Sequence, residues 1–224
     1  MPKIELIYDD PNQNYFLREA YKTARTNFMF SGSGIKTVIV TSCQMSEGKS
    51  TVSLNLALSL AEFGKRVLLL DADLRKSIMA NHIDAPLEKG FSHFLSGQAE
   101  WNEVVCQTQF EKLDVVFSGK TPPNPVELIG SDRMKRCLED AREEYDYILI
   151  DSPPLGMVID SAVLAPFCDG AILVLDTGRI PAREAQRVKA QLEKSGCRLL
   201  GVILNHTQKA KKFPALLSKR KSKK

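Results

Sequence analysis

The sequence has little of several features that mark other classes of protein. Aromatic residues make up only 7% of the 224 residues, with Trp101 as the single tryptophan, so the core must consist mainly of aliphatic side chains. No apolar run reaches the roughly 18 residues that span a bilayer. The first ten residues also lack the basic and apolar pattern of a secretory signal. We therefore expect a cytoplasmic globular protein.

Paired cysteines are also missing from the sequence. The five cysteines are odd in number, lie far apart and form no CxxC pair. This spacing is typical of reduced thiols and argues against a disulfide framework or a cysteine metal site. The residues are Cys43, Cys106, Cys137, Cys168 and Cys197.

Acidic residues are absent after Glu193, whereas lysine and arginine crowd residues 208–224. We expect this segment to be a solvated, flexible basic tail. Attraction of the tail to an anionic membrane surface or an acidic partner is the alternative. The net charge of +4 is mild, and we expect no nucleic-acid partner.

Short apolar runs alternate along the chain with longer helix-like segments. The runs are nearly continuous in valine, isoleucine and leucine, which is typical of parallel strands covered on both faces. Alternating strands and helices predict a doubly wound α/β fold with a mostly parallel sheet. The predicted strands cover residues 37–40, 67–70, 113–117, 147–150, 171–175 and 199–204, and the predicted helices include 50–63, 133–144 and 182–194.

The domain organisation follows from this pattern. Residues 1–34 are expected to form an N-terminal helical segment, residues 35–207 a nucleotide-binding domain and residues 208–224 the basic tail. In the first segment Leu17, Ala20, Tyr21 and Ala24 recur at helical spacing. This segment is either a helix packed on the domain or a docking helix for another subunit.

A phosphate-binding loop is predicted between the first strand and the following helix. A loop at a helix N-terminus presents free backbone N–H groups and the positive end of the helix dipole. Gly48 permits close backbone approach, Lys49 can reach the β- and γ-phosphates, and the Ser50 hydroxyl can ligate Mg²⁺. The loop continues from Ser46 and Glu47 into Thr51, while Cys43 stands where the usual pattern has its first glycine.

Carboxylates are expected at the ends of two further strands. Asp71 and Asp73 follow one apolar run and Asp151 follows another. Acids at such positions are costly to desolvate unless a cation or a donor meets them. Because the carboxyl ends of parallel strands share one edge, the residues together predict a site for ATP and Mg²⁺. Asn205, at the end of the last strand, is either an adenine contact or a turn residue.

Together these motifs resemble those of the bacterial tyrosine kinases that control capsular and extracellular polysaccharide production. Members of that family carry a Walker A sequence ending GEGK[ST], a Walker A′ sequence DxDxR and a Walker B sequence DxPP. The matching segments here are 46–50, 71–75 and 151–154, and the resemblance extends over roughly residues 19–205. Residues 122–128 are also similar to the family.

The resemblance implies a phosphotransferase that acts on protein tyrosines. Lys49 would bind the β- and γ-phosphates, with Arg75 nearby in the nucleotide site. Ser50, Asp71 and Asp151 would hold Mg²⁺ and its water shell. Asp73 would orient or deprotonate the tyrosine hydroxyl. Asn205 would contact adenine.

The resemblance also implies partners. Glu19, Lys22 and Arg25 correspond to an ExxRxxR subunit contact of a homo-oligomer, with Lys22 in place of the first arginine, and lysine does not replace a bidentate arginine. A separate membrane-anchored activator, which also regulates polysaccharide chain length, would hold the kinase at the inner face of the cell membrane. Protein tyrosines would be the substrates.

Two departures from the family leave alternatives open. Met45 and Ser46 replace the usual Pro-Gly, which affects the backbone freedom of the loop. The tyrosine cluster that neighbouring subunits phosphorylate does not follow Asn205. A MinD/ParA-type ATPase switch and a non-catalytic scaffold in a polysaccharide export complex are therefore the competing interpretations.

Overall fold

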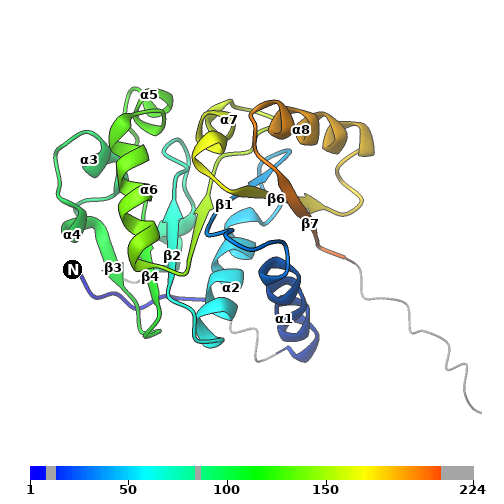
Figure 1. The fold of residues 1–224 in the computed structure, drawn as a ribbon, viewed down its shortest axis with the longest axis horizontal. Coiled ribbons are helices and arrows are strands. Elements are labelled where there is room, and N and C mark those ends of the chain that lie inside the picture. The colour runs from blue at the N-terminus through cyan, green and yellow to red at the C-terminus, as the bar shows by residue number, and fades with distance from the viewer. Residues whose placement is uncertain (9–13, 84–86, 208–224) are drawn as a thin grey trace, which may run out of the picture.

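The computed structural model describes residues 1–8, 14–83 and 87–207, which form a central sheet with helices on both faces (Figure 1). The strand order is β3-β4-β2-β5-β1-β6-β7, and all neighbouring pairs are parallel except β3 and β4. The strands are β1 Thr37–Ser42, β2 Val67–Asp71, β3 Val105–Gln107, β4 Leu113–Val116, β5 Tyr147–Asp151, β6 Gly170–Asp176 and β7 Leu199–Asn205. The predicted doubly wound α/β fold is confirmed.

The apolar runs form the central strands because both faces of the sheet are covered. Every residue of β1 is buried, and successive side chains enter different cores. Ile39 packs in the core on the face of helices α5 to α8, whereas Val38 and Val40 pack in the core beneath α1 and α2. Two apolar faces explain why these runs show no polar alternation.

The helices begin where local capping and apolar spacing favour them. Asn14 accepts hydrogen bonds from the backbone N–H groups of Phe16 and Leu17 at the start of α1, and Ser131 accepts one from Met134 before α6. The α-helices are α1 Tyr15–Met29, α2 Lys49–Glu62, α3 Phe91–Leu95, α4 Trp101–Val104, α5 Pro125–Ile129, α6 Asp132–Glu144, α7 Asp160–Leu164 and α8 Ala182–Lys194.

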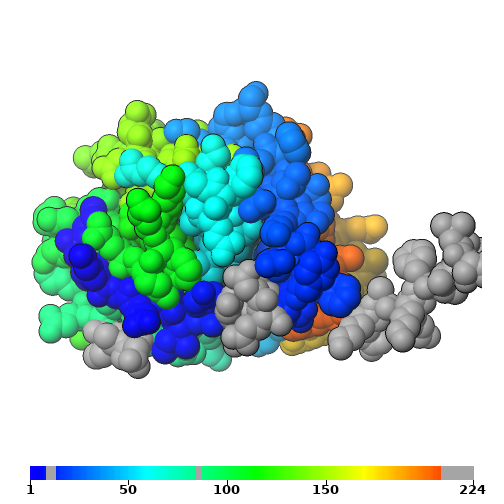
Figure 2. Space-filling model, turned by 90° about the horizontal axis from the view of Figure 1, so that it is seen from below, coloured from blue at the N-terminus to red at the C-terminus, as the bar shows by residue number. Residues whose placement is uncertain are grey.

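The N-terminal segment is only partly helical. Residues 1–8 run along the edge of the sheet, where Ile4 N donates to Gln107 O at 2.9 Å and Ile7 N donates to His82 O at 2.7 Å. Figure 2 shows this segment, in dark blue, lying along the surface of the molecule. The helix α1 then packs against α2. Residues 208–224, for which a basic tail was predicted, lie outside the described residues.

The register of the sheet brings the predicted site residues together. Asp71 of β2 lies directly opposite Asp151 of β5, and Val40 of β1 lies on the other side of Asp151. The carboxyl ends of β2, β5 and β1 are therefore neighbours at one edge.

No helix in the described ranges is long and apolar enough to span a membrane. All five cysteines are free thiols.

Candidate nucleotide-binding site

The loop between β1 and α2 has the backbone geometry of a phosphate-binding loop. Gly48 is the N-cap of α2 and adopts a left-handed conformation with φ of +80°, which a residue without a Cβ atom adopts at little cost. No cap side chain accepts a hydrogen bond from the first turn of α2. The first turn therefore presents backbone N–H groups and the positive helix end, as an anion site requires.

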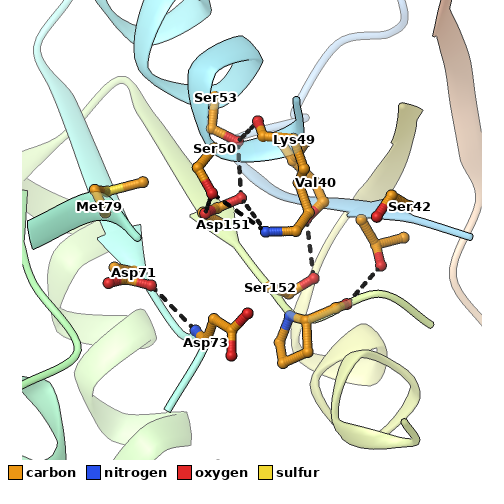
Figure 3. A network of polar contacts seen from close by, with 12 residues as sticks. Val40, Ser42, Lys49, Ser50, Ser53, Asp71, Asp73, Met79, Asp151 and Ser152 are labelled. Atoms are coloured by element: carbon orange, nitrogen blue, oxygen red, sulfur yellow. Dashed lines mark hydrogen bonds and ion pairs between the residues drawn. The ribbon is translucent and has the colours of Figure 1, made fainter. Parts of the chain in front are cut away.

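Asp151 connects the loop to the end of β5. Its carboxylate forms an ion pair of 2.9 Å with Lys49 Nζ and accepts a 2.5 Å hydrogen bond from Ser50 Oγ. Ser53 Oγ, one helical turn further along α2, donates to the same carboxylate at 3.2 Å. All four residues are buried. Figure 3 shows the Asp151 carboxylate enclosed by these three side chains.

Asp71 lies beside this cluster at the end of β2. Its carboxylate accepts hydrogen bonds from the backbone N–H groups of Asp73, at 3.2 Å, and Ser118, at 3.1 Å, and from the Ser77 hydroxyl. Asp71 is nevertheless fully buried, and this burial raises its pKa to about 7, with a further increase from the negative charge of Asp151. The two carboxylates, at neighbouring strand ends, thus repel each other, and a cation bound beside them would reduce this repulsion.

Asp73 and Arg75 face the same region from the segment after β2. The Asp73 carboxylate accepts hydrogen bonds from Arg75 N at 3.2 Å and Lys76 N at 3.0 Å, which fixes its position. The Arg75 side chain turns toward α7, where its Nε lies 2.8 Å from Asp160 Oδ1. The carboxylate of Asp73 is therefore held in the site by backbone N–H groups of the turn that follows it, whereas the side chain of Arg75 is held by Asp160.

A cavity of about 160 Å³ opens at this edge of the sheet. It brings together the phosphate-binding loop, the segment after β2 and the segment after β5. Its lining includes Ser46, Gly48, Lys49, Ser50, Asp73 and Arg75. Six of the residues predicted from the sequence thus surround one space. Asp71 and Asp151 lie buried behind it, at the ends of β2 and β5.

Three other predicted residues have different environments. Glu47 is buried, and its carboxylate accepts hydrogen bonds from the backbone N–H groups of Gln44 and Asp176, so its side chain ties the loop to β6. Asn205 Nδ2 donates to Glu47 O at 3.0 Å, from the end of β7. Thr51 is exposed on the first turn of α2. The adenine contact of Asn205 remains a prediction.

Cys43 and Ser46, where the loop departs from the usual phosphate-binding pattern, both have distinctive environments in the structure. Cys43 is fully buried, and Gly156 lies so close that a Cβ atom there would stand 2.1 Å from Cys43 O. Ser46 adopts a positive φ of 61°, which is strained for a residue other than glycine. A glycine at this position, as in the family, would adopt this conformation without that strain.

The sequence interpretation missed several residues that organise the site. Asp160 is buried at the start of α7 and holds Arg75, while its Oδ2 atom has no hydrogen-bond partner among the described residues. Ser53, Ser77 and Ser118 donate to the two central carboxylates. Only Ser53 carried a local signal, because it lies one turn after Lys49 and Ser50 on the same helix face.

The fold and this site define a P-loop nucleotide-binding protein of the α/β class. Comparison with known proteins agrees with this assignment: residues 36–182 match the AAA domain family. The chain is 41% identical over 206 residues to the tyrosine-protein kinase CpsD of Streptococcus agalactiae, covering 92% of this chain and 90% of that protein. The chain therefore belongs to the family of bacterial tyrosine-protein kinases.

Solved structures lead to the same conclusion. The crystal structure of the chimerical protein CapA2B2 matches with a TM-score of 0.84 and 28% identity, over 93% of this chain and 95% of that one. The Mg-ADP complex of MinD from Pyrococcus horikoshii matches less well, with a TM-score of 0.63 and 26% identity, over 75% of this chain and 69% of that one. The predicted resemblance to bacterial tyrosine kinases is confirmed, and the enzyme class is a protein-tyrosine kinase of the bacterial P-loop type.

Proposed function

We propose that the chain transfers the γ-phosphoryl group of ATP, bound with Mg²⁺, to tyrosine hydroxyls of proteins. The observation that carries this proposal is the cluster in which Asp151 contacts both Lys49 and Ser50, with Asp71 at the adjacent strand end. By this activity the chain regulates capsular or extracellular polysaccharide production. In phosphoryl transfer of this kind the protein contributes mainly positioning and electrostatic stabilisation.

Lys49 is the residue proposed to contact the β- and γ-phosphates. Its ammonium lines the cavity and is paired with Asp151, so nucleotide binding requires it to exchange part of that contact for phosphate oxygens. The backbone from Ser46 to Thr51 supplies N–H donors at the start of α2. Positive charge placed where negative charge develops in the transition state accelerates the reaction.

Ser50, Asp71 and Asp151 are the residues proposed to hold Mg²⁺ and its water shell. They fit the ion because hydroxyl and carboxylate oxygens are its preferred donors. The raised pKa of Asp71, caused in part by the charge of Asp151, supports a cation between or beside the two carboxylates. When bound, the ion would neutralise charge on the phosphates.

Asp73 is the residue proposed to align the tyrosine hydroxyl and accept its proton. It lines the cavity with 9% of its surface exposed, and two backbone N–H groups hold its carboxylate. Asp160 contributes indirectly, by holding Arg75 at the rim of the same cavity. Asn205 is proposed to contact adenine from the end of β7.

The proposed partners are a membrane-anchored activator and further copies of the chain. The activator would bring the kinase to the inner face of the membrane. The subunit contact predicted at Glu19, Lys22 and Arg25 lies on α1. Arg25 also donates to Ser59 O at 3.0 Å within its own chain, so part of its hydrogen-bonding capacity is used in fixing α1 to α2. Glu19 and Lys22 remain partly exposed.

Phosphotyrosine mapping tests the proposal directly. The full chain is incubated with ATP and Mg²⁺, and its phosphotyrosines are identified by mass spectrometry. The Lys49→Met variant is expected to lose tyrosine phosphorylation by at least about 100-fold, as loss of a transition-state contact does, while its circular dichroism stays native. Asp73→Asn should lose transfer to tyrosine yet still bind nucleotide.

Lys135→Met is the matched control, since the Lys135 side chain is 57% exposed on α6, remote from the site residues in the sequence. It should retain full activity. ATP hydrolysis without phosphotyrosine in the wild-type chain would support the MinD/ParA-type switch instead. Unchanged phosphorylation in Lys49→Met would contradict the proposed site.

A further inference from the structure

The five tyrosines of the chain differ in how accessible they are to a kinase. Tyr145 is 3% exposed, and its hydroxyl donates to Asp114 Oδ2 at 2.7 Å. Burial raises its pKa far above the usual range for tyrosine. Burial also raises the pKa of Tyr21 to about 12. The Tyr145 hydroxyl is enclosed by the fold and cannot enter another active site without local unfolding. Tyr21 is only partly buried and lies in a small surface pocket beside Asn55 and Ser59 of α2.

Two further tyrosines are held by aromatic neighbours. The ring of Tyr147 packs against Phe28 with the ring centroids 5.1 Å apart, and burial raises its pKa. The ring of Tyr8 meets Phe110 at 5.3 Å in an edge-to-face arrangement. Both residues belong to the apolar cluster beneath α1 and α2. Their rings contribute to packing, so presenting them as substrates would disrupt that packing.

Tyr15 differs from the other four. It is 62% exposed and is the first residue of α1, where the side chain of Asn14 caps the helix. Phe16 beside it is 82% exposed. In the space-filling view α1, in blue, lies at the surface (Figure 2). The Tyr15 side chain can therefore enter the active site of a second molecule without any loss of core packing.

The surroundings of Tyr15 suit a phosphate group. The guanidinium carbon of Arg18 lies 5.8 Å from the centre of the Tyr15 ring, one helical turn away. Among the described residues the Arg18 side chain also contacts Glu19, at 3.9 Å, and its buried Nε atom has no hydrogen-bond partner there. The first turn of α1 contains no acidic residue. A negative charge at this position would gain from both the arginine and the helix dipole.

We propose that Tyr15 is the tyrosine of this chain that a second copy of the kinase phosphorylates. The proposal rests on the kinase function proposed above. The hydroxyl oxygen of Tyr15 attacks the γ-phosphorus of ATP bound to the other copy. The bond from that phosphorus to the β–γ bridging oxygen breaks, ADP leaves, and the hydroxyl proton passes to the Asp73 carboxylate of that copy. Transfer occurs between copies because α1 packs on α2 and contributes no residue to the cavity lining within the described ranges.

Mixing two distinguishable copies tests this proposal. Unlabelled wild-type chain is incubated with ATP, Mg²⁺ and an isotopically heavy Lys49→Met chain, which serves only as acceptor. Mass spectrometry should then find phosphate on Tyr15 of the heavy chain. Adding Tyr15→Phe to the heavy chain should lower its phosphotyrosine at least tenfold, whereas Tyr147→Phe, the matched control, should leave it unchanged. A heavy Asp73→Asn acceptor repeats the test in case Lys49→Met alters the fold.

The outcomes separate this inference from the kinase function itself. Phosphate on another tyrosine of the heavy chain, undiminished phosphorylation of Tyr15→Phe, or phosphate confined to the light chain would overturn the inference. A synthetic glutamate–tyrosine copolymer, added in parallel, reports kinase activity alone. Phosphorylated copolymer without phosphate on Tyr15 removes the inference and leaves the kinase function standing. ATP hydrolysis with neither product overturns both.

Discussion

Two lysine–carboxylate pairs in this molecule have the same length and very different surroundings. Lys49 Nζ lies 2.9 Å from Asp151 Oδ1, and Lys22 Nζ lies 2.9 Å from Glu19 Oε1. The side chains of the first pair are 9% and 1% exposed, whereas both side chains of the second are 43% exposed. The distance alone therefore says little about what each pair contributes.

Burial decides the difference between the two pairs. Water screens the pair on α1, so that breaking it changes little. The pair at the sheet edge is desolvated, and removal of one partner leaves a buried charge without compensation. The buried pair thus fixes the geometry of the nucleotide site, while the exposed pair on α1 is free to exchange its contacts with another molecule.

Removing the acid from each pair is expected to give the largest contrast. Asp151→Ala leaves the Lys49 ammonium buried without its carboxylate and should lower the free energy of unfolding by about 3 kcal/mol. Glu19→Ala should leave the urea midpoint unchanged. Urea denaturation followed by circular dichroism measures both. Equal effects of the two substitutions would show that burial does not control the strength of these pairs.

Two glycines that flank β1, Gly34 before it and Gly48 in the loop after it, both have a positive φ, and alanine substitutions compare them. Gly48→Ala combines a left-handed φ of +80° with a Cβ atom 2.0 Å from Asn205 Nδ2, so Asn205 must give up its hydrogen bond to Glu47. The expected loss of stability is about 2–3 kcal/mol, with weaker nucleotide binding.

Gly34→Ala is the control for this substitution. Gly34 has a φ of +86°, and a Cβ atom there would meet no atom within 4 Å among the described residues, so only the backbone strain of about 1 kcal/mol applies. Thermal melts and titration with a fluorescent ATP analogue measure both effects. A Gly34→Ala variant as unstable as Gly48→Ala would remove the role assigned to Asn205.

The titration of Asp71 makes the stability of the sheet edge depend on pH. Burial and the charge of Asp151 raise the pKa of Asp71 from 3.8 in the unfolded chain to about 7 in the folded protein. Between these values the folded state keeps a proton that the unfolded state has lost. The contribution of Asp71 to stability therefore falls as pH rises from about 4 to about 7 and stays low above that.

The variant Asp71→Asn removes this titration. Relative to Asp71→Asn, wild-type stability should fall by about 2 kcal/mol between pH 5 and pH 7 when both proteins are free of metal. Urea denaturation across this range, in the presence of a chelator, measures the difference. Parallel pH profiles for the two proteins would contradict the raised pKa.

Ser46→Gly should give the smallest effect, and in the stabilising direction. Ser46 has a φ of 61°, so glycine relieves strain, and part of this gain is offset by the greater flexibility of glycine in the unfolded chain. The expected gain is at most about 1 kcal/mol. Ser195→Gly, at a position with φ of −77°, should instead be neutral or destabilising. Thermal melts distinguish these signs.

The strands were the most predictable part of the fold. Six of the predicted apolar runs correspond to β1, β2, β4, β5, β6 and β7, because strands buried on both faces need nearly continuous apolar sequence. Asp71 and Asp151 are the last residues of β2 and β5 rather than the residues after them. β3 was missed because three residues at an antiparallel edge carry too little pattern.

The short helices were harder to predict than the long ones. α2, α6 and α8 have 13 or 14 residues, and each was anticipated within a residue or two. α3, α4, α5 and α7 have four or five residues, less than two turns, so no apolar periodicity can develop. Tertiary packing holds them, and α7 supplies Asp160 to the site.

The sequence by itself was enough to predict which residues form the site, because Asp71, Asp73 and Asp151 follow apolar runs typical of buried strands, and Lys49 and Ser50 follow a loop that contains Gly48. Only the tertiary structure decided which of these groups touch. The order of β2, β5 and β1 places Asp71 beside Asp151, although 80 residues separate them along the chain. The ion pair of Asp160 with Arg75 and the exposure of Tyr15 also depend on packing between distant segments, which no local pattern encodes.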